Sequence, residues 1–174
     1  MTRNQITQEI ADLKETQGFK KTFDFVVSFI AEANKADTIS VPINNAGDFQ
    51  ELGYNILHTE NSVMHVPAPT EDDPDAVEDV NFCAVKLQFR SESANNSQSN
   101  DLIPIQLIAT PGSTKNPRYG TRPFLFIYPE GDTLVISYDN REPEQLNDET
   151  YTMKNERVDI VFNGKNYITK VAQA

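Results

Sequence analysis

The chain is poor in the residues that build disulfide-bonded or metal-stabilised folds. Its 174 residues include one cysteine, two histidines and no tryptophan. One cysteine cannot close an internal disulfide, and two histidines are too few for the common zinc modules, so both classes of scaffold are excluded. A chain of this length is normally long enough to bury a core of its own. We therefore expect folding to require no metal or cofactor.

Positive charge and long apolar runs are also scarce. Fifteen Lys and Arg stand against 26 Asp and Glu, which gives a formal net charge of −11. A surface of this sign repels phosphate backbones and anionic lipid, so we expect neither nucleic acid nor membrane as a partner. No apolar run approaches the roughly 18 residues of a membrane span, and residues 1–5 do not resemble a secretory signal. We expect a protein that is made in the cytoplasm and is not secreted.

Residues 5–34 carry apolar side chains at helical spacing. The apolar positions recur every three or four residues, and Gly18 divides the pattern into two predicted helices. The second helix also carries Phe23, Phe25 and Phe29, so its apolar surface is wider than a single stripe. Such a helix needs two contacts. It either lies between its own sheet and the first helix, or it also packs on a neighbouring subunit.

After about residue 37 the pattern changes to short runs of β-branched and aromatic residues, separated by Gly, Pro and Asn. We expect a mainly β fold, a jelly-roll-like antiparallel β-sandwich over residues 38–174, preceded by the helical segment at 1–37. The expected strands are 38–43, 54–59, 62–66, 80–90, 102–110, 123–128, 133–138, 158–162 and 165–170.

Two turns predict hairpins. Residues 128–131 read Tyr-Pro-Glu-Gly, with proline and glycine at favourable turn positions, and Asn163-Gly164 lies between two strand-like runs. A two-residue loop at Asn163-Gly164 would place Ile160 opposite Tyr167.

The cysteine and the histidines do not indicate a catalytic site. Cys83 belongs to a run whose odd-numbered residues are apolar, so period two places it on the buried face of a strand. Buried thiols are weak nucleophiles. His58 and His65 flank a predicted hairpin, but no nucleophile or metal-ligand motif accompanies them. We assign a core role to Cys83 and no catalytic or metal role to the histidines.

Two segments have strongly opposed charge. Residues 71–79 hold six carboxylates, including Asp72 and Asp73, and could bind calcium, although the spacing does not match an EF-hand loop. Residues 110–123 contain three basic and no acidic residues. Arg118 and Arg122 are therefore expected to meet an anionic protein surface or carboxylates of their own domain.

These segments also suggest a way for copies of the chain to associate. The acidic segment of one copy would face the basic segment of the next, in a head-to-tail contact. Buried aromatic residues would supply the affinity, and we assign that role to Tyr119 and Phe124 beside the basic segment and to the three phenylalanines of the predicted second helix.

Residues 122–140 and 158–165 combine an aromatic strand, a Pro/Gly turn, an alternating strand ending in Asn, and a predicted last hairpin that closes on Asn-Gly or Gly-Lys. This part of the chain resembles jelly-roll virion proteins of bacteriophages. The resemblance implies a capsid-associated, penton, decoration or connector protein located in the virion. Its partners would be copies of itself and other virion proteins, and it would have no catalytic residues, small-molecule substrate or cofactor.

Two other classes use the same architecture. A carbohydrate-binding β-sandwich would stack sugars on exposed aromatic residues and hold calcium in the acidic segment, but the lack of tryptophan disfavours it. A cupin-like enzyme would need a ligand cluster, which two histidines without a glutamate motif do not provide. The virion protein is the preferred hypothesis, and the carbohydrate-binding module is the alternative.

Overall fold

A computed structural model describes residues 17–44, 47–108, 126–145 and 148–169. These residues form antiparallel sheets, and their one α-helix is the four-residue α2 (Ile105–Ile108). The predicted mainly β class is therefore confirmed. Within these ranges, no helix is long and apolar enough to cross a membrane.

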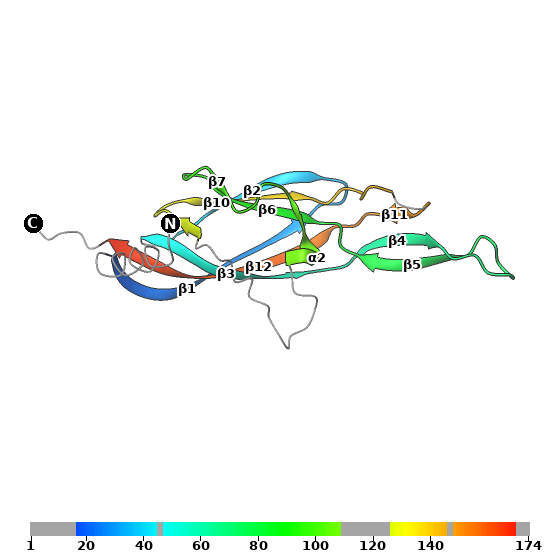
Figure 1. Ribbon diagram of the computed structural model, residues 1–174, viewed down its shortest axis with the longest axis horizontal. Coiled ribbons are helices and arrows are strands. Elements are labelled where there is room, and N and C mark those ends of the chain that lie inside the picture. The colour runs from blue at the N-terminus through cyan, green and yellow to red at the C-terminus, as the bar shows by residue number, and fades with distance from the viewer. Residues whose placement is uncertain (1–16, 45–46, 109–125, 146–147, 170–174) are drawn as a thin grey trace, which may run out of the picture.

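Two sheets stack as a sandwich (Figure 1). The first sheet has the strand order β1-β12-β3-β9, and its strands are β1 (Gln17–Ala31), β12 (Glu156–Thr169), β3 (Asp48–His58) and β9 (Phe126–Tyr128). The second has the order β2-β10-β6-β7, with β8 also pairing with β6. Its strands are β2 (Ala36–Pro42), β10 (Thr133–Asp139), β6 (Lys86–Ser91), β7 (Asn96–Ser97) and β8 (Ile103–Pro104).

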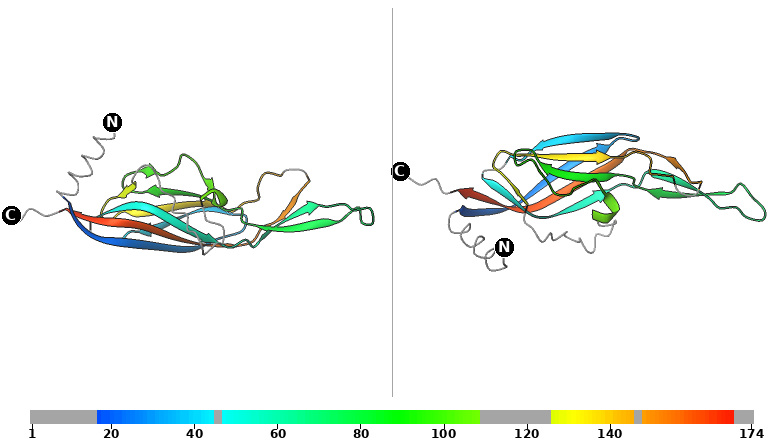
Figure 2. Two further views of the ribbon diagram at one scale, coloured as in Figure 1. Left: turned by 60° about the horizontal axis from the view of Figure 1, so that its bottom comes forward. Right: turned by 45° about the horizontal axis from the view of Figure 1, so that its top comes forward.

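A third, smaller sheet extends beyond one end of the sandwich (Figures 1 and 2). It has the order β11-β4-β5, and its strands are β11 (Thr150–Thr152), β4 (Ser62–Pro67) and β5 (Val77–Phe82). We call this sheet, together with the connection 68–76 at its tip, the arm. The arm is assembled from two separate parts of the chain, because β11 lies far from β4 and β5 in the sequence.

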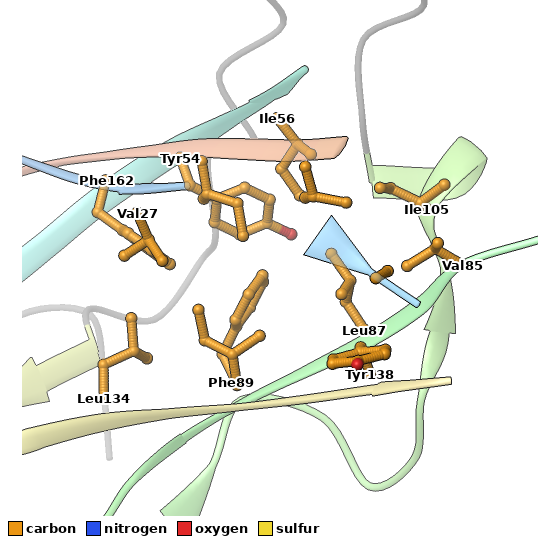
Figure 3. Packing of buried hydrophobic residues seen from close by; sticks show 14 of the residues in the cluster. Val27, Tyr54, Ile56, Val85, Leu87, Phe89, Ile105, Leu134, Tyr138 and Phe162 are labelled. Carbon is orange, nitrogen blue, oxygen red and sulfur yellow. The ribbon is translucent and has the colours of Figure 1, made fainter. Parts of the chain in front are cut away.

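The core fills the space between the two stacked sheets (Figure 3). Alternation along β6 buries Leu87 and Phe89, and Cys83 and Val85 continue the same odd-numbered series just before the strand. The ring of Phe89 lies 5.4 Å from that of Tyr54 on β3 and 5.4 Å from that of Phe162 on β12, both edge to face. Aromatic contacts of this geometry join the two sheets. The predicted burial of Cys83 is confirmed.

The predicted second helix is wrong, because residues 17–31 form strand β1. The whole strand pairs with β12. From Phe25 to Ala31 the odd-numbered side chains face the core, whereas Val26 and Ile30 face outward. Together with the inward residues, these two outward aliphatic residues reproduce the spacing of an apolar helix face. The sequence therefore fits the helical period as well as the strand period of two residues. The predicted first helix lies outside the described residues.

The predicted hairpin at Asn163-Gly164 is also wrong, since β12 continues straight through it. A Cβ atom on Gly164 would overlap the ring of Phe49 and the carbonyl oxygen of Gln50 on β3, and the β12–β3 register shifts at this point. Glycine inside a strand is typical of such bulges and close approaches. Ile160 therefore pairs with Val27 and Ile56, not with Tyr167.

The other predicted turn forms one residue later than expected, over 129–132, and it connects two sheets. The carbonyl oxygen of Pro129 accepts a hydrogen bond from the Asp132 amide at 3.1 Å, and Gly131 has φ +73°, which favours glycine. The flanking strands, β9 and β10, belong to different sheets, so they do not form a hairpin. The predicted hairpin between His58 and His65 fails for the same reason, because β3 and β4 lie in different sheets.

Two of the predicted strands are divided. The run at 80–90 separates into β5 and β6, with Cys83 in the connection between them. The run at 102–110 begins as the two-residue β8 and continues as α2, up to Ile108.

Candidate functional site

The arm is the part of the molecule whose presence the packing of the sandwich core does not account for. One of its faces carries a chain of polar contacts across all three strands. Nδ1 of His65 on β4 lies 2.7 Å from Oδ1 of Asp79 on β5, and Nε2 lies 2.8 Å from Oγ1 of Thr152 on β11. His65 and Asp79 are directly opposite in the register, and Thr152 is diagonal to His65. The strand pairing therefore brings a hydroxyl, an imidazole and a carboxylate into one row.

The order hydroxyl, imidazole, carboxylate is that of a nucleophile, a base and the group that orients the base. Here the row lies on an open sheet face, with 67% of the Asp79 side chain and 31% of the His65 side chain exposed. Catalysis also requires a recess for substrate and donors for a developing charge. The surroundings of the row suit a different role, because cross-strand polar pairs of this kind hold neighbouring strands in register.

The opposite face of the arm is apolar. Met64 on β4 lies opposite Val80 and Tyr151 on the neighbouring strands, and the ring of Phe82 lies 5.7 Å from the ring of Tyr151. Burial and the hydrogen bond to Glu149 both raise the pKa of Tyr151. These side chains form a small apolar cluster on the arm, in which Met64, Phe82 and Tyr151 are half-buried and Val80 is exposed.

A buried carboxylate joins the arm to the sandwich. Glu156, the first residue of β12, is fully buried and accepts hydrogen bonds from the backbone amides of Asn61 and Ser62 and from the hydroxyls of Thr59 and Ser62, at 2.7 to 3.1 Å. All the donors lie in the connection between β3 and β4 or at the start of β4. Because a buried carboxylate is stable only when its oxygens are satisfied, this contact fixes where the arm leaves the sandwich.

A cavity of about 590 Å³ opens beside this junction and is lined by Ala33, Asn61, Met153, Lys154 and Asn155. Its lining includes one cationic residue, Lys154. The backbone amide of Lys154 already donates a hydrogen bond to Ser62 Oγ on the arm, at 3.1 Å. The cavity is wide open to solvent, which suits a surface recess at a junction between sheets.

The acidic segment predicted as a contact forms the tip of the arm and the first part of β5. All six carboxylate residues between 71 and 79 are exposed. The Thr70 amide donates to the carbonyl oxygen of Asp73 at 2.9 Å, and the Asp75 amide donates to Asp73 Oδ1 at 3.1 Å, so local turns shape the tip. In the part of the chain that the structure describes, no group of three or more His, Cys, Asp or Glu side chains is placed to hold a metal ion.

Inside the sandwich, a second carboxylate is held in a polar network. Glu51 on β3 is 3% exposed, and its Oε2 accepts hydrogen bonds from Gln98 Nε2 and from the hydroxyl of Tyr128 at 3.2 Å. Gln98 Nε2 also donates to the Tyr128 hydroxyl at 2.7 Å. The network links the first sheet to the connection that follows β7, so its evident effect is to join the two sheets at their edge.

The structure places the predicted contact residues in different surroundings. Phe25 and Phe29 are half-buried and pack inward, where the ring of Phe29 lies 5.7 Å from Tyr138. The Cα atom of Phe23 lies opposite Gly164 in the β1–β12 ladder. Asp72 and Asp73 are exposed at the arm tip. Four predicted contact residues lie outside the described residues: Arg118, Tyr119, Arg122 and Phe124.

Sequence reasoning missed Glu156 and the row formed by His65, Asp79 and Thr152. Glu156 follows a polar stretch and gives no sign of burial, because all its donors come from residues about 95 positions earlier. The row depends on the pairing of β11 with β4. These two strands are not joined by a turn, so the sequence gives no local signal of their pairing. Only a prediction of the arm's strand order would have revealed either feature.

No family model matches the chain, and neither a curated protein nor a solved structure matches it. Function therefore has to be inferred from the fold and the surface of the protein.

Proposed function

We propose that the chain is a jelly-roll structural protein of a virus or phage particle, without enzymatic activity, which assembles through protein–protein contacts. The strand pairing supports the jelly roll. This fold arises when a long antiparallel ribbon rolls up, so that strands 1 and 8, 2 and 7, 3 and 6, and 4 and 5 pair. If the arm strands and the short β8 are set aside, the corresponding pairs are β1–β12, β2–β10, β3–β9 and β6–β7, and all four are formed.

The arm is the observation on which the assembly role rests. It consists of one insertion between the third and fourth jelly-roll strands and another between the seventh and eighth. Both insertions emerge at the same end and extend the molecule away from its core (Figure 2). A projection that is clamped at its base by Glu156 and carries an acidic tip is suited to reach a neighbouring subunit.

The interior of the sandwich favours the structural role over the other classes that use jelly rolls. Its space is taken up by packed aromatic and aliphatic side chains, such as Tyr54, Phe89 and Phe162 (Figure 3). A cupin-like enzyme holds its ligands in this space. The phage resemblance supports the same role through its alternating strand, which β10 forms, but not through its predicted last hairpin, because β12 continues through Asn163-Gly164.

The direct test is to look for the chain in purified particles of the virus that encodes it. Mass spectrometry should find the protein at a fixed copy number per particle, and antibodies against the recombinant protein should label intact particles. Absence from particles, combined with calcium-dependent binding of the recombinant protein to an immobilised glycan, would overturn the proposal in favour of a carbohydrate-binding module. An Asp72→Asn and Asp73→Asn variant would then show whether the tip holds the calcium.

A further inference from the structure

The outward faces of the two stacked sheets differ in chemistry. The second sheet presents polar side chains to solvent: Thr38, Ser40, Gln88, Arg90 and Ser137. The first sheet presents aliphatic ones, with the exposed Asp24 and Ser28 of β1 among them. Val26 is 60% exposed, Ile30 is 50% exposed and Leu57 is 56% exposed. Single exposed aliphatic residues are ordinary, but a group of them on one sheet face indicates an interaction surface.

The register places these residues together. Val26 on β1 pairs with Val161 on β12, and Leu57 on β3 pairs with Asp159, two residues before Val161 on β12. Ile30 pairs with Arg157, which is two residues further along the same side of β12. We call these six residues the outer patch: Val26, Ile30, Leu57, Arg157, Asp159 and Val161.

The outer patch is electrostatically self-complementary. Arg157 Nε donates a hydrogen bond to Asp159 Oδ2 at 2.9 Å, and the aliphatic side chains lie around this pair. Copies of a chain with net charge −11 repel one another through most of their surface. The six residues of the patch carry no net charge. A two-fold axis through the patch would place the Arg157 of each copy near the Asp159 of the other.

We propose that the outer patch binds a second copy of this chain in a two-fold symmetric, face-to-face contact of the two first sheets. A symmetric contact requires a surface that is complementary to itself, which an apolar patch with one cation and one anion provides. The outward face of the second sheet lacks this combination, because its valine, Val135, is only 3% exposed and lies between the polar residues Ser40 and Arg90.

The size of the face suits a stable dimer. The three long strands β1, β12 and β3, of 15, 14 and 11 residues, lie about 4.8 Å apart and rise about 3.3 Å per residue, which gives a face of about 600 Å². Two copies would then bury about 1,200 Å², the lower end of the range for specific interfaces. Ile127 on β9, 44% exposed, adds a further aliphatic side chain to the edge of this sheet.

This contact goes beyond the proposed function, because a dimer can form whether or not the protein belongs to a particle. The experiment is sedimentation velocity of the full chain over a wide concentration range, with the wild type, Leu57→Lys and Leu107→Lys. Leu107 on α2 is 76% exposed and lies outside the patch, so its variant is the matched control. We expect a wild-type dimer, an increase of about 100-fold in the dimer dissociation constant for Leu57→Lys, and no change for Leu107→Lys.

A charge exchange tests the symmetry of the contact. Arg157→Asp would place like charges across the two-fold axis and weaken the dimer, whereas Arg157→Asp combined with Asp159→Arg would restore both signs and recover it. Unchanged melting temperatures would show that the variants fold. A wild type that stays monomeric at every concentration, or a Leu57→Lys dimer as tight as the wild type, would overturn the inference. Neither result would affect whether the chain is found in particles.

Discussion

At the scale of single residues, Cys83 shows how burial removes chemical reactivity. The side chain is 1% exposed, and burial raises the pKa of its thiol to about 12. Because the thiolate is the reactive form, we expect a thiol reagent at pH 8 to label native protein very slowly and unfolded protein within the mixing time. The measurement is the absorbance of the released chromophore with and without denaturant. Fast labelling of the native protein would show that the sulfur is accessible.

A buried aspartate predicts how stability depends on pH. Burial acts to raise the pKa of Asp132, but hydrogen bonds from the Ser91 hydroxyl and from the Ser93 and Thr133 amides outweigh burial and lower it. A lowered pKa in the folded state gives stability that is present above the unfolded value of about 3.9 and is lost as the pH falls through the folded value.

Asp132→Asn should therefore lower the free energy of unfolding by about 1–3 kcal/mol at pH 7 and by progressively less below pH ~4. Denaturant titrations at a series of pH values measure both effects. Asp72→Asn at the exposed arm tip is the control and should leave the profile unchanged. Parallel profiles for wild type and Asp132→Asn would show that this carboxylate does not contribute to acid sensitivity.

At the scale of elements, Gly164 allows β12 to pass close to Phe49 and Gln50 on β3. An added methyl group would overlap the Phe49 ring on β3, so Gly164→Ala should destabilise the fold by about 1–3 kcal/mol. The double variant Gly164→Ala with Phe49→Leu should lose less than the sum of the two single variants, because the smaller side chain relieves the overlap with the ring, while the overlap with the Gln50 carbonyl oxygen remains. Chemical denaturation measures all three. Strict additivity would contradict the close approach of these residues.

The junction of the arm gives a second prediction for an element. Glu156→Gln would turn an amide N–H₂ toward donors that need an acceptor, which should cost about 2 kcal/mol and loosen the arm. Hydrogen exchange should become faster in β4, β5 and β11 and remain slow in β10. Glu60→Gln, at an exposed position in the same connection, is the matched control. Equal acceleration in all strands would mean that Glu156 supports the whole fold and not the arm in particular.

Local patterns predicted strands where one face is clearly buried and failed where both faces carry apolar residues. The strands at 38–43 and 133–138 are found almost as expected, because apolar and polar residues alternate along them, apart from Val135 on the outer face of the second strand. β1 was mistaken for a helix because Val26 and Ile30 on its outer face add to the inward phenylalanines. The hairpin predicted at Asn163-Gly164 was wrong because a hairpin and a bulge both favour glycine. Only the position of Phe49 distinguishes the two.

The candidate site was predictable only in part. The acidic segment was identified from composition alone, because six carboxylates in nine residues must remain in solvent. Its position at the end of a projecting arm depends on the pairing of β4 with both β5 and β11, and no local signal reports a pairing between distant segments. The outer patch was missed for the same reason. The wide apolar surface predicted for residues 23–30 includes two of its members, Val26 and Ile30.

At the scale of the whole molecule, the outer patch and the acidic arm tip would form contacts of different kinds. An apolar contact is nearly independent of salt, whereas attraction between an acidic tip and cationic residues of another copy is screened within a Debye length. A two-fold dimer that also makes head-to-tail contacts through its arms would assemble into rings or lattices. Salt should therefore separate the two levels of assembly.

We expect light scattering to detect assemblies larger than a dimer at about 0.01 M salt, where the Debye length is about 30 Å, and only dimers at about 1 M, where it is about 3 Å. Asp72→Lys with Asp73→Lys should abolish the larger assemblies even at low salt. Glu92→Lys with Glu144→Lys changes the net charge equally at exposed positions outside the arm and should not abolish them. Arg118→Glu with Arg122→Glu should abolish them as well, and a mixture of the two assembly-deficient proteins should restore assembly if the acidic and basic segments meet. Large assemblies that persist at high salt in the arm variant would show that the arm tip is not an assembly contact and that copies join through apolar surface alone.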